Sequence, residues 1–119
     1  MNRRKVGTDG ETLAAAFLEK QGVSILERNY RNKSGEIDLI GRDGEYLVFF
    51  EVKYRRCGDC GHPEEAVGSV KQRQICRVAD YYRITHGISL QAAQRYDVIA
   101  IEGEQIRWVK NAFPHQYGR

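Results

Sequence analysis

The segment Gly35-Glu36-Ile37-Asp38-Leu39-Ile40 is followed, after a turn, by Phe50-Glu51-Val52-Lys53. Both segments are rich in Ile, Leu, Val and Phe, which favours strands over 36–42 and 45–54. Asp43-Gly44 lies between them and is a strong signal for a two-residue hairpin turn. The two segments are therefore expected to form an antiparallel pair.

This turn also predicts which side chains share a face of the sheet. With Asp43 and Gly44 as the turn residues, Arg42 pairs with Glu45, and Asp38 lies opposite Phe49. Counted in the same way, Glu36 lies opposite Glu51. The ionisable side chains expected on one face are Glu36, Asp38, Glu51 and Lys53. Asp38 and Glu51 become diagonal neighbours with backbones about 7 to 8 Å apart, a gap that two carboxylates can span around one cation.

Both faces of this hairpin are otherwise apolar, which is typical of strands covered on both sides. Ionised groups are costly there unless they are paired or bound to metal. The apolar residues expected beside the ionisable groups are Ile40, Leu47 and Phe49, and those expected on the other face are Ile37, Leu39, Val48, Phe50 and Val52. Two interpretations stay open. The acids can hold magnesium for phosphodiester hydrolysis with Lys53 assisting, or Lys53 can form a buried ion pair that only organises the core.

The rest of the chain predicts two helices and three further strands. A helix is expected from Asp9 to Gln21, with Thr8 and Glu11 as a capping box, and a second from Ser69 to near Gly87, with Ser69 and Gln72 in the same roles. Strands are expected over 23–30, 95–101 and 105–109. The order helix, three strands, helix, two strands predicts an α/β sandwich with a mixed sheet of about five strands. We expect one domain over residues 1–119, with strands 45–54 and 95–101 parallel.

Composition places the chain among soluble globular proteins, since it is 41% hydrophobic and 29% charged. No apolar run approaches the roughly 20 residues of a membrane helix, and the polar start Met1-Asn2-Arg3-Arg4-Lys5 lacks an apolar signal segment. We therefore expect a cytoplasmic protein with no membrane partner and reduced cysteines. Cys57 and Cys60 have the spacing of a zinc knuckle, but no second pair of ligands follows, which argues against structural zinc.

Basic residues bracket the acidic motifs, although the net charge is only +3. Those of interest are Arg31, Lys33, Arg55 and Lys71. Such clustering favours contact with phosphates of a nucleic acid, and a solvated basic surface is the alternative interpretation.

The sequence resembles the YraN family of bacterial nuclease-like proteins, within the restriction-endonuclease-like superfamily that includes archaeal Holliday junction resolvases. The resemblance covers nearly the whole chain. It is carried by Gly10-Glu11, Leu26-Glu27-Arg28-Asn29-Tyr30, Gly35-Glu36-Ile37-Asp38-Leu39-Ile40, Glu51-Val52-Lys53-Tyr54-Arg55, Lys71-Gln72, Arg95-Tyr96-Asp97-Val98 and Asn111-Ala112-Phe113. Cys57 and Cys60 depart from the family pattern.

The resemblance implies a restriction-endonuclease-like fold and a catalytic role for Asp38, Glu51 and Lys53. It adds Glu11 as the acid of the first helix, so that Asp38, Glu51 and Glu11 would bind Mg²⁺ or Mn²⁺. The capping role predicted for Glu11 can coexist with this one. Glu36 is expected as a secondary acid at the rim.

Three further residues are expected to lie near the site, each with an alternative role. Lys71 and Gln72, near the start of the second helix, are expected to approach phosphate, with an ordinary solvated helix face as the alternative. Asp97 is expected either to support the site from behind or to be a buried partner of Arg95, and the second role is favoured.

The resemblance thus implies an endonuclease acting on DNA, including branched or structured DNA, and allows a homodimer. A catalytically inactive nucleic-acid-binding or adaptor domain with the same fold is the main alternative. An interaction protein with no nucleic-acid partner is the third.

Overall fold

The computed structural model describes the backbone of residues 3–55 and 67–117 and the side chains of residues 10–54 and 67–117. Within these residues the elements are α1 (Arg3–Lys20), β1 (Ser24–Asn32), β2 (Gly35–Asp43), β3 (Tyr46–Arg55), α2 (Ser69–Thr85), β4 (Gln94–Glu102) and β5 (Gln105–Val109). This order confirms the predicted succession of helix, three strands, helix and two strands.

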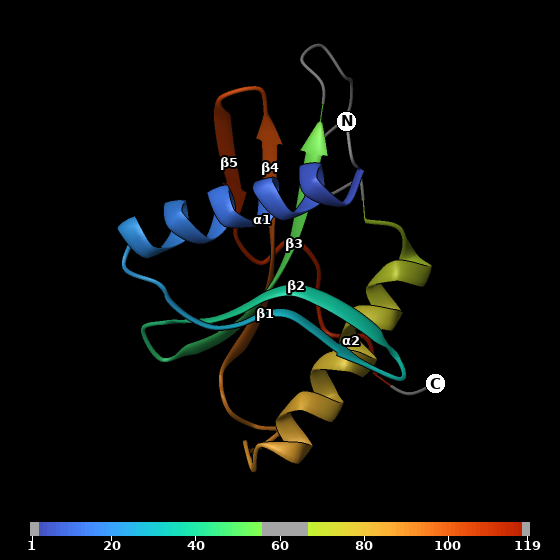
Figure 1. Ribbon diagram of the computed structural model, residues 1–119. Coiled ribbons are helices and arrows are strands. Elements are labelled where there is room, and N and C mark those ends of the chain that lie inside the picture. Colours follow the sequence, from blue (N-terminus) through green and yellow to red (C-terminus); the bar gives the residue numbers. More distant parts are fainter. Residues whose placement is uncertain (1–2, 56–66, 118–119) are drawn as a thin grey trace.

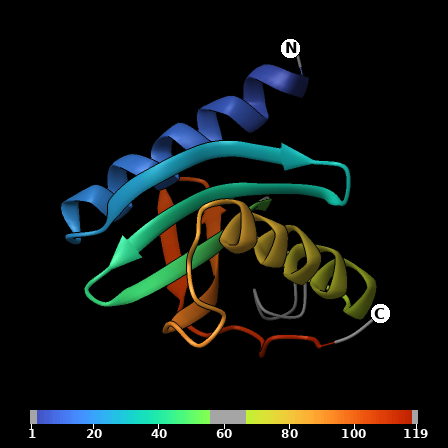
Figure 2. The same ribbon diagram turned by 90° about the horizontal axis from the view of Figure 1, so that it is seen from below.

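The five strands form one sheet in chain order, β1-β2-β3-β4-β5. β3 and β4 are parallel, and every other neighbouring pair is antiparallel, so the sheet is mixed as predicted. α1 covers one face and α2 the other (Figures 1 and 2). The connection from β3 to β4 passes through α2, which is the crossover that a parallel pair requires.

Each helix builds its own hydrophobic core against the central strands. The core under α1 contains Ala14, Leu18, Val23, Leu39, Val48, Phe50, Ile99 and Ile101. The core under α2 contains Ile37, Ile40, Leu47, Phe49, Ile75, Val78, Ala79, Tyr82, Tyr96 and Val98. β3 contributes to both cores on alternate residues, which confirms that it is a strand covered on both sides.

The predicted start of the first helix was wrong, whereas the second helix does begin at Ser69 but without the predicted capping box. α1 begins at Arg3, so Thr8 lies inside the helix and cannot be its N-cap. α2 has Gly68 as its N-cap, without a side-chain cap hydrogen bond, and Ser69 is the first helical residue. Glycine is tolerated at an N-cap because its backbone adopts the extended conformation easily. Gln72 instead donates a hydrogen bond from Nε2 to the carbonyl of Val67 (2.8 Å).

The β2–β3 hairpin has a different turn from the predicted one. Asp43 pairs with Tyr46, so Gly44 and Glu45 are the turn residues. Gly44 has φ +62° at the first turn position, where one common two-residue hairpin turn requires glycine. The predicted pairs of Asp38 with Phe49 and of Glu36 with Glu51 are therefore wrong, and Phe49 pairs with Ile40.

The structure describes only one of the three cysteines, and it tests the expected lack of a membrane helix. Cys57 and Cys60 lie outside the described residues, whereas Cys76 is a buried free thiol in α2. Among the described residues, neither helix is long and apolar enough to cross a membrane.

Candidate active site

The candidate site lies where β2 and β3 separate. Their paired residues end at Leu39 and Phe50, although β2 continues to pair with β1 and β3 continues beside β4. Figure 1 shows β2 leading away toward α2 while β3 continues alongside β4. Asp38 and Glu51, the next residues beyond the last pair, therefore stand at the point of divergence.

The side chain of Asp38 contacts the backbone of β3 where the two strands separate. Its Oδ2 accepts a hydrogen bond of 2.7 Å from the backbone N–H of Val52, on the other strand. The carboxylate satisfies a donor that regular pairing with β2 would otherwise have satisfied, and buried donors need such a partner. Ile37 packs in the core under α2 rather than on the face predicted for it, because β2 has turned away from β3 at this point.

Glu51 is buried beside a cation. Its Oε2 lies 3.3 Å from Nζ of Lys53, which is partly exposed. Residues two apart on a strand project from the same face, so the Glu-x-Lys spacing alone brings these groups together. This ion pair is the second of the two interpretations of Lys53 that stayed open from the sequence.

The two carboxyl groups resist ionisation. Burial raises the pKa of Asp38 to about 6, with further increases from the charges of Glu11 and Glu36, against the lowering effect of the Val52 hydrogen bond. Burial also raises the pKa of Glu51 to about 7, and the neighbouring charge of Asp38 adds to the increase. Lys71 and Lys53 act in the opposite direction on Glu51. A divalent cation at this place would relieve both effects.

α1 brings Glu11 within electrostatic range of Asp38. The helix approaches β3 closely here, since a Cβ added at Gly10 would lie 2.9 Å from the ring of Tyr54. With Thr8 inside the helix, the capping role predicted for Glu11 is wrong. Glu11 thus comes near the candidate site, as the resemblance implied.

The carboxylates do not form a complete cage. Among the described residues, no three Asp, Glu, His or Cys side chains gather closely enough to hold a metal ion. Mg²⁺ usually keeps several waters and binds through one or two carboxylates, so Asp38 and Glu51 suffice for such a site.

Three of the predicted phosphate-binding residues meet in one pocket of about 300 Å³. Arg31 and Lys33 come from the β1–β2 turn region and Lys71 from α2, and Glu36 lies beside them. Asn32 and Gln74 also line this pocket, and neither was predicted as a site residue. A turn of Asn, Lys, Ser and Gly beside a basic helix start was the only signal present.

Two other predicted residues lie elsewhere. The side chain of Gln72 is hydrogen-bonded within the protein: its Nε2 donates to the carbonyl of Val67, and its Oε1 accepts from Nε2 of Gln116 (3.3 Å). Arg55 is the last residue of β3, and its side chain is outside the described part of the chain.

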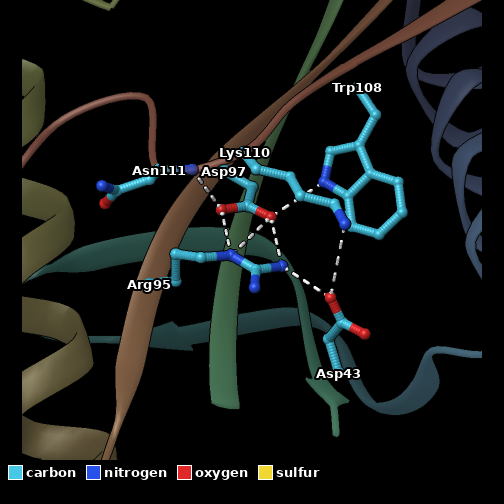
Figure 3. Close-up of polar contacts among 6 residues, drawn as sticks. All are labelled: Asp43, Arg95, Asp97, Trp108, Lys110 and Asn111. Atoms are coloured by element: carbon cyan, nitrogen blue, oxygen red, sulfur yellow. Dashed lines mark hydrogen bonds and ion pairs between the residues drawn. The ribbon is translucent and has the colours of Figure 1, made fainter.

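Asp97 belongs to a separate polar network (Figure 3). It is fully buried and accepts hydrogen bonds from the Arg95 guanidinium, from Nε1 of Trp108 (2.8 Å) and from the backbone N–H of Asn111 (2.9 Å). Arg95 also contacts Asp43 at 2.8 Å. The network joins the β2–β3 turn to β4 and to the end of β5.

Comparison with known proteins identifies the family. The model of the uncharacterised protein family UPF0102 matches residues 10–101, from α1 to β4. The chain belongs to the UPF0102 family. A UPF0102 protein of Lachnoclostridium phytofermentans is 46% identical over 113 residues, which cover 95% of this chain and 96% of the relative. UPF0102 proteins of Syntrophus aciditrophicus and Coxiella burnetii are 45% and 41% identical, over 97% and 96% of this chain and 93% and 96% of their own lengths.

Proposed function

We propose that this UPF0102 protein is a metal-dependent endonuclease of the restriction-endonuclease-like type, acting on phosphodiester bonds of DNA. The observation that carries the proposal is the divergence of β2 and β3, which leaves Asp38 and Glu51 side by side with Lys53 3.3 Å from Glu51. The resemblance to YraN and resolvase sequences adds support, and it extends the proposal to branched DNA.

The donor atoms suit a hard cation. Carboxylate oxygens are preferred by Mg²⁺ and Mn²⁺, and both acids are costly to ionise in the absence of a counter-charge. When bound, such a cation activates the phosphate and a water molecule for hydrolysis. Asp38 and Glu51 would hold it, and Glu11 would add negative charge from α1.

Lys53 would stabilise negative charge that develops on the phosphate. Its ammonium group lies on the face of the sheet that carries Glu51, and it is partly exposed. A substrate phosphate beside Glu51 would therefore meet a positive charge aimed at the oxygens that gain charge during cleavage. Stabilisation of such developing charge is among the larger contributions to catalysis.

The experiment is a cleavage assay with labelled linear, nicked and four-way DNA in the presence of Mg²⁺ or Mn²⁺. The wild type is compared with the double variant Asp38→Asn, Glu51→Gln and with Glu104→Gln, an exposed acid in the β4–β5 turn. We expect cleavage by the wild type and by the control variant, and none by the double variant. Equal cleavage by the double variant would remove the catalytic assignment.

A non-catalytic nucleic-acid-binding domain is the second candidate. The observation that favours it is the lack, among the described side chains, of three metal-binding groups gathered in one place. It predicts salt-sensitive binding of DNA without turnover under any metal condition. A third outcome, no binding of DNA or RNA at low salt, would favour a protein-interaction role.

A further inference from the structure

A polar pocket of about 300 Å³ lies between the β1–β2 turn and α2. Its walls include Arg31, Lys33 and Glu36 from the strands and turn, and Lys71 and Gln74 from the helix. Residues that are about 40 positions apart in the sequence thus form one concave surface. This pocket is distinct from the point where β2 and β3 diverge, although it adjoins it through β2.

The pocket carries an excess of positive charge. Three of its residues are cationic and one is anionic, with Arg31 Nη2 lying 3.4 Å from Glu36 Oε1. This pair is solvent-exposed, with 73% of the Arg31 side chain accessible. Exposed pairs of this kind are weak, so Arg31 can exchange Glu36 for a stronger anionic partner.

The shape of the pocket depends on a close contact between the turn and α2. Gly35 has φ +145°, and a Cβ at this position would lie 2.8 Å from the side chain of Gln74. A side chain at residue 35 would therefore have to displace the Gln74 side chain or the turn. The glycine of the Gly35-Glu36-Ile37-Asp38 segment is explained by this packing rather than by chemistry at Asp38.

The pocket also adjoins the acidic site. Glu36 is two residues from Asp38 on β2, and its charge is felt by the Asp38 carboxyl group. Lys71 lines the pocket and acts electrostatically on both Asp38 and Glu51. A strand bound with one phosphate at Asp38 and Glu51 would thus place another phosphate within reach of the pocket.

We propose that this pocket is a phosphate-binding subsite for the nucleic-acid strand, in which Arg31, Lys33 and Lys71 bind a phosphate next to the one at the acidic site. The inference rests on the proposed function, since it takes the phosphate to belong to a nucleic acid. Guanidinium and ammonium groups are the usual partners of phosphate oxygens, and Gln74 adds an amide donor. The phosphate is either an internal one or the terminal one of a strand.

Binding is measured by fluorescence anisotropy on a labelled single-stranded oligodeoxynucleotide, prepared with and without a 5′-phosphate. EDTA is present, so that cleavage is not required. The variants are Arg31→Gln, Lys33→Gln and Lys71→Gln, with Lys20→Gln at the exposed end of α1 as the matched control. Each pocket variant is expected to weaken binding by about fivefold and to reduce the salt slope by about one. Glu36→Gln is expected to tighten binding.

The outcomes separate the two proposals. Unchanged affinity and salt slope in all three pocket variants would overturn the subsite, even if the wild type cleaves DNA. Weaker binding in the pocket variants, with wild-type binding in Lys20→Gln, would support it even if no cleavage occurs. An affinity gain from the 5′-phosphate that the pocket variants lose would assign the pocket to a terminal phosphate, and equal losses on both oligonucleotides would assign it to an internal one.

Discussion

Asp38 and Glu51 have pKa values well above those of ordinary surface acids. Burial is the main cause of their raised pKa values, and neighbouring negative charge adds to it, from Glu11 and Glu36 at Asp38 and from Asp38 at Glu51. Neither the burial of these carboxyl groups nor the charges around them can be predicted from the two acids alone. The sequence did place them on one covered face of a hairpin, which is why they were selected.

These pKa values predict how stability depends on pH. A carboxyl group whose pKa is higher in the folded than in the unfolded state binds more protons when folded. Stability is therefore lost as pH rises from the unfolded pKa, near 4, to the folded values of about 6 for Asp38 and about 7 for Glu51. We expect the free energy of unfolding to fall by on the order of a few kcal/mol across this window in EDTA.

Urea unfolding from pH 4 to 8 tests this expectation. In the double variant Asp38→Asn, Glu51→Gln the fall should be largely removed, and in Glu104→Gln it should persist. Added Mn²⁺ should restore stability to the wild type near neutral pH, because it binds the ionised acids. An identical pH dependence in wild type and double variant would contradict the burial of these charges.

Lys53 is predicted to matter for rate more than for folding. Replacement by Gln removes the ammonium group beside Glu51 but keeps a chain of similar length. Cleavage by Lys53→Gln is expected to be slower by about 10² to 10³, as for loss of one transition-state charge contact. Single-turnover cleavage of labelled DNA measures this, and circular dichroism checks the fold. A wild-type rate would show that Lys53 serves only the ion pair.

Among the elements, the β2–β3 hairpin shows both the strength and the limit of sequence reasoning. Asp43-Gly44 predicted a two-residue turn, and the real turn is one residue later. The pairing consequently shifts by two residues, and such a shift keeps the paired side chains on their predicted faces. Ile37, which lies beyond the last pair, packs on the face opposite to the predicted one. Glu51 and Lys53 do project from one face of β3, as predicted from the wrong register. The divergence of the strands beyond the Leu39–Phe50 pair, which begins at Asp38 and Glu51, could not be predicted from the sequence.

Gly35 is predicted to be the structural requirement of the β1–β2 turn. In Gly35→Ala the methyl group meets Gln74 in a backbone conformation that favours glycine. Destabilisation of about 1 to 3 kcal/mol is expected. Gly103→Ala has a positive φ but open space around the position, so its cost should be smaller. Thermal unfolding compares the two variants, and equal stabilities would show that contact with α2 adds nothing.

Asp97 is predicted to stabilise the sheet without acting in catalysis. Asp97→Asn would leave Arg95 and Trp108 with a weaker partner in a fully buried place, at a cost of about 3 to 5 kcal/mol. Asp43→Asn should cost less, because Asp43 is partly exposed and meets Arg95 only at the turn. Urea unfolding measures both. Wild-type stability in Asp97→Asn, or loss of cleavage in its folded form, would contradict this role.

At the scale of the whole molecule, the order of elements and the mixed sheet could be predicted, because periodicity and turn residues are local. The way in which residues distant in the sequence come together could not be predicted. The pocket joins Lys33 to Gln74, and the site joins Glu11 on α1 to Asp38 on β2. Both depend on how each helix lies on its face of the sheet, which residue spacing does not encode. Only the family resemblance had selected Glu11.

Asp38 and Glu51 are together expected to bind a divalent cation. A crystal of the wild type soaked in Mn²⁺, with anomalous scattering recorded near the manganese edge, tests it most directly. We predict an anomalous peak between the two carboxylates, with water completing the coordination, and no such peak in a crystal of Asp38→Asn, Glu51→Gln. Full manganese occupancy elsewhere, or an intact Glu51–Lys53 ion pair with no peak beside it, would contradict the claim.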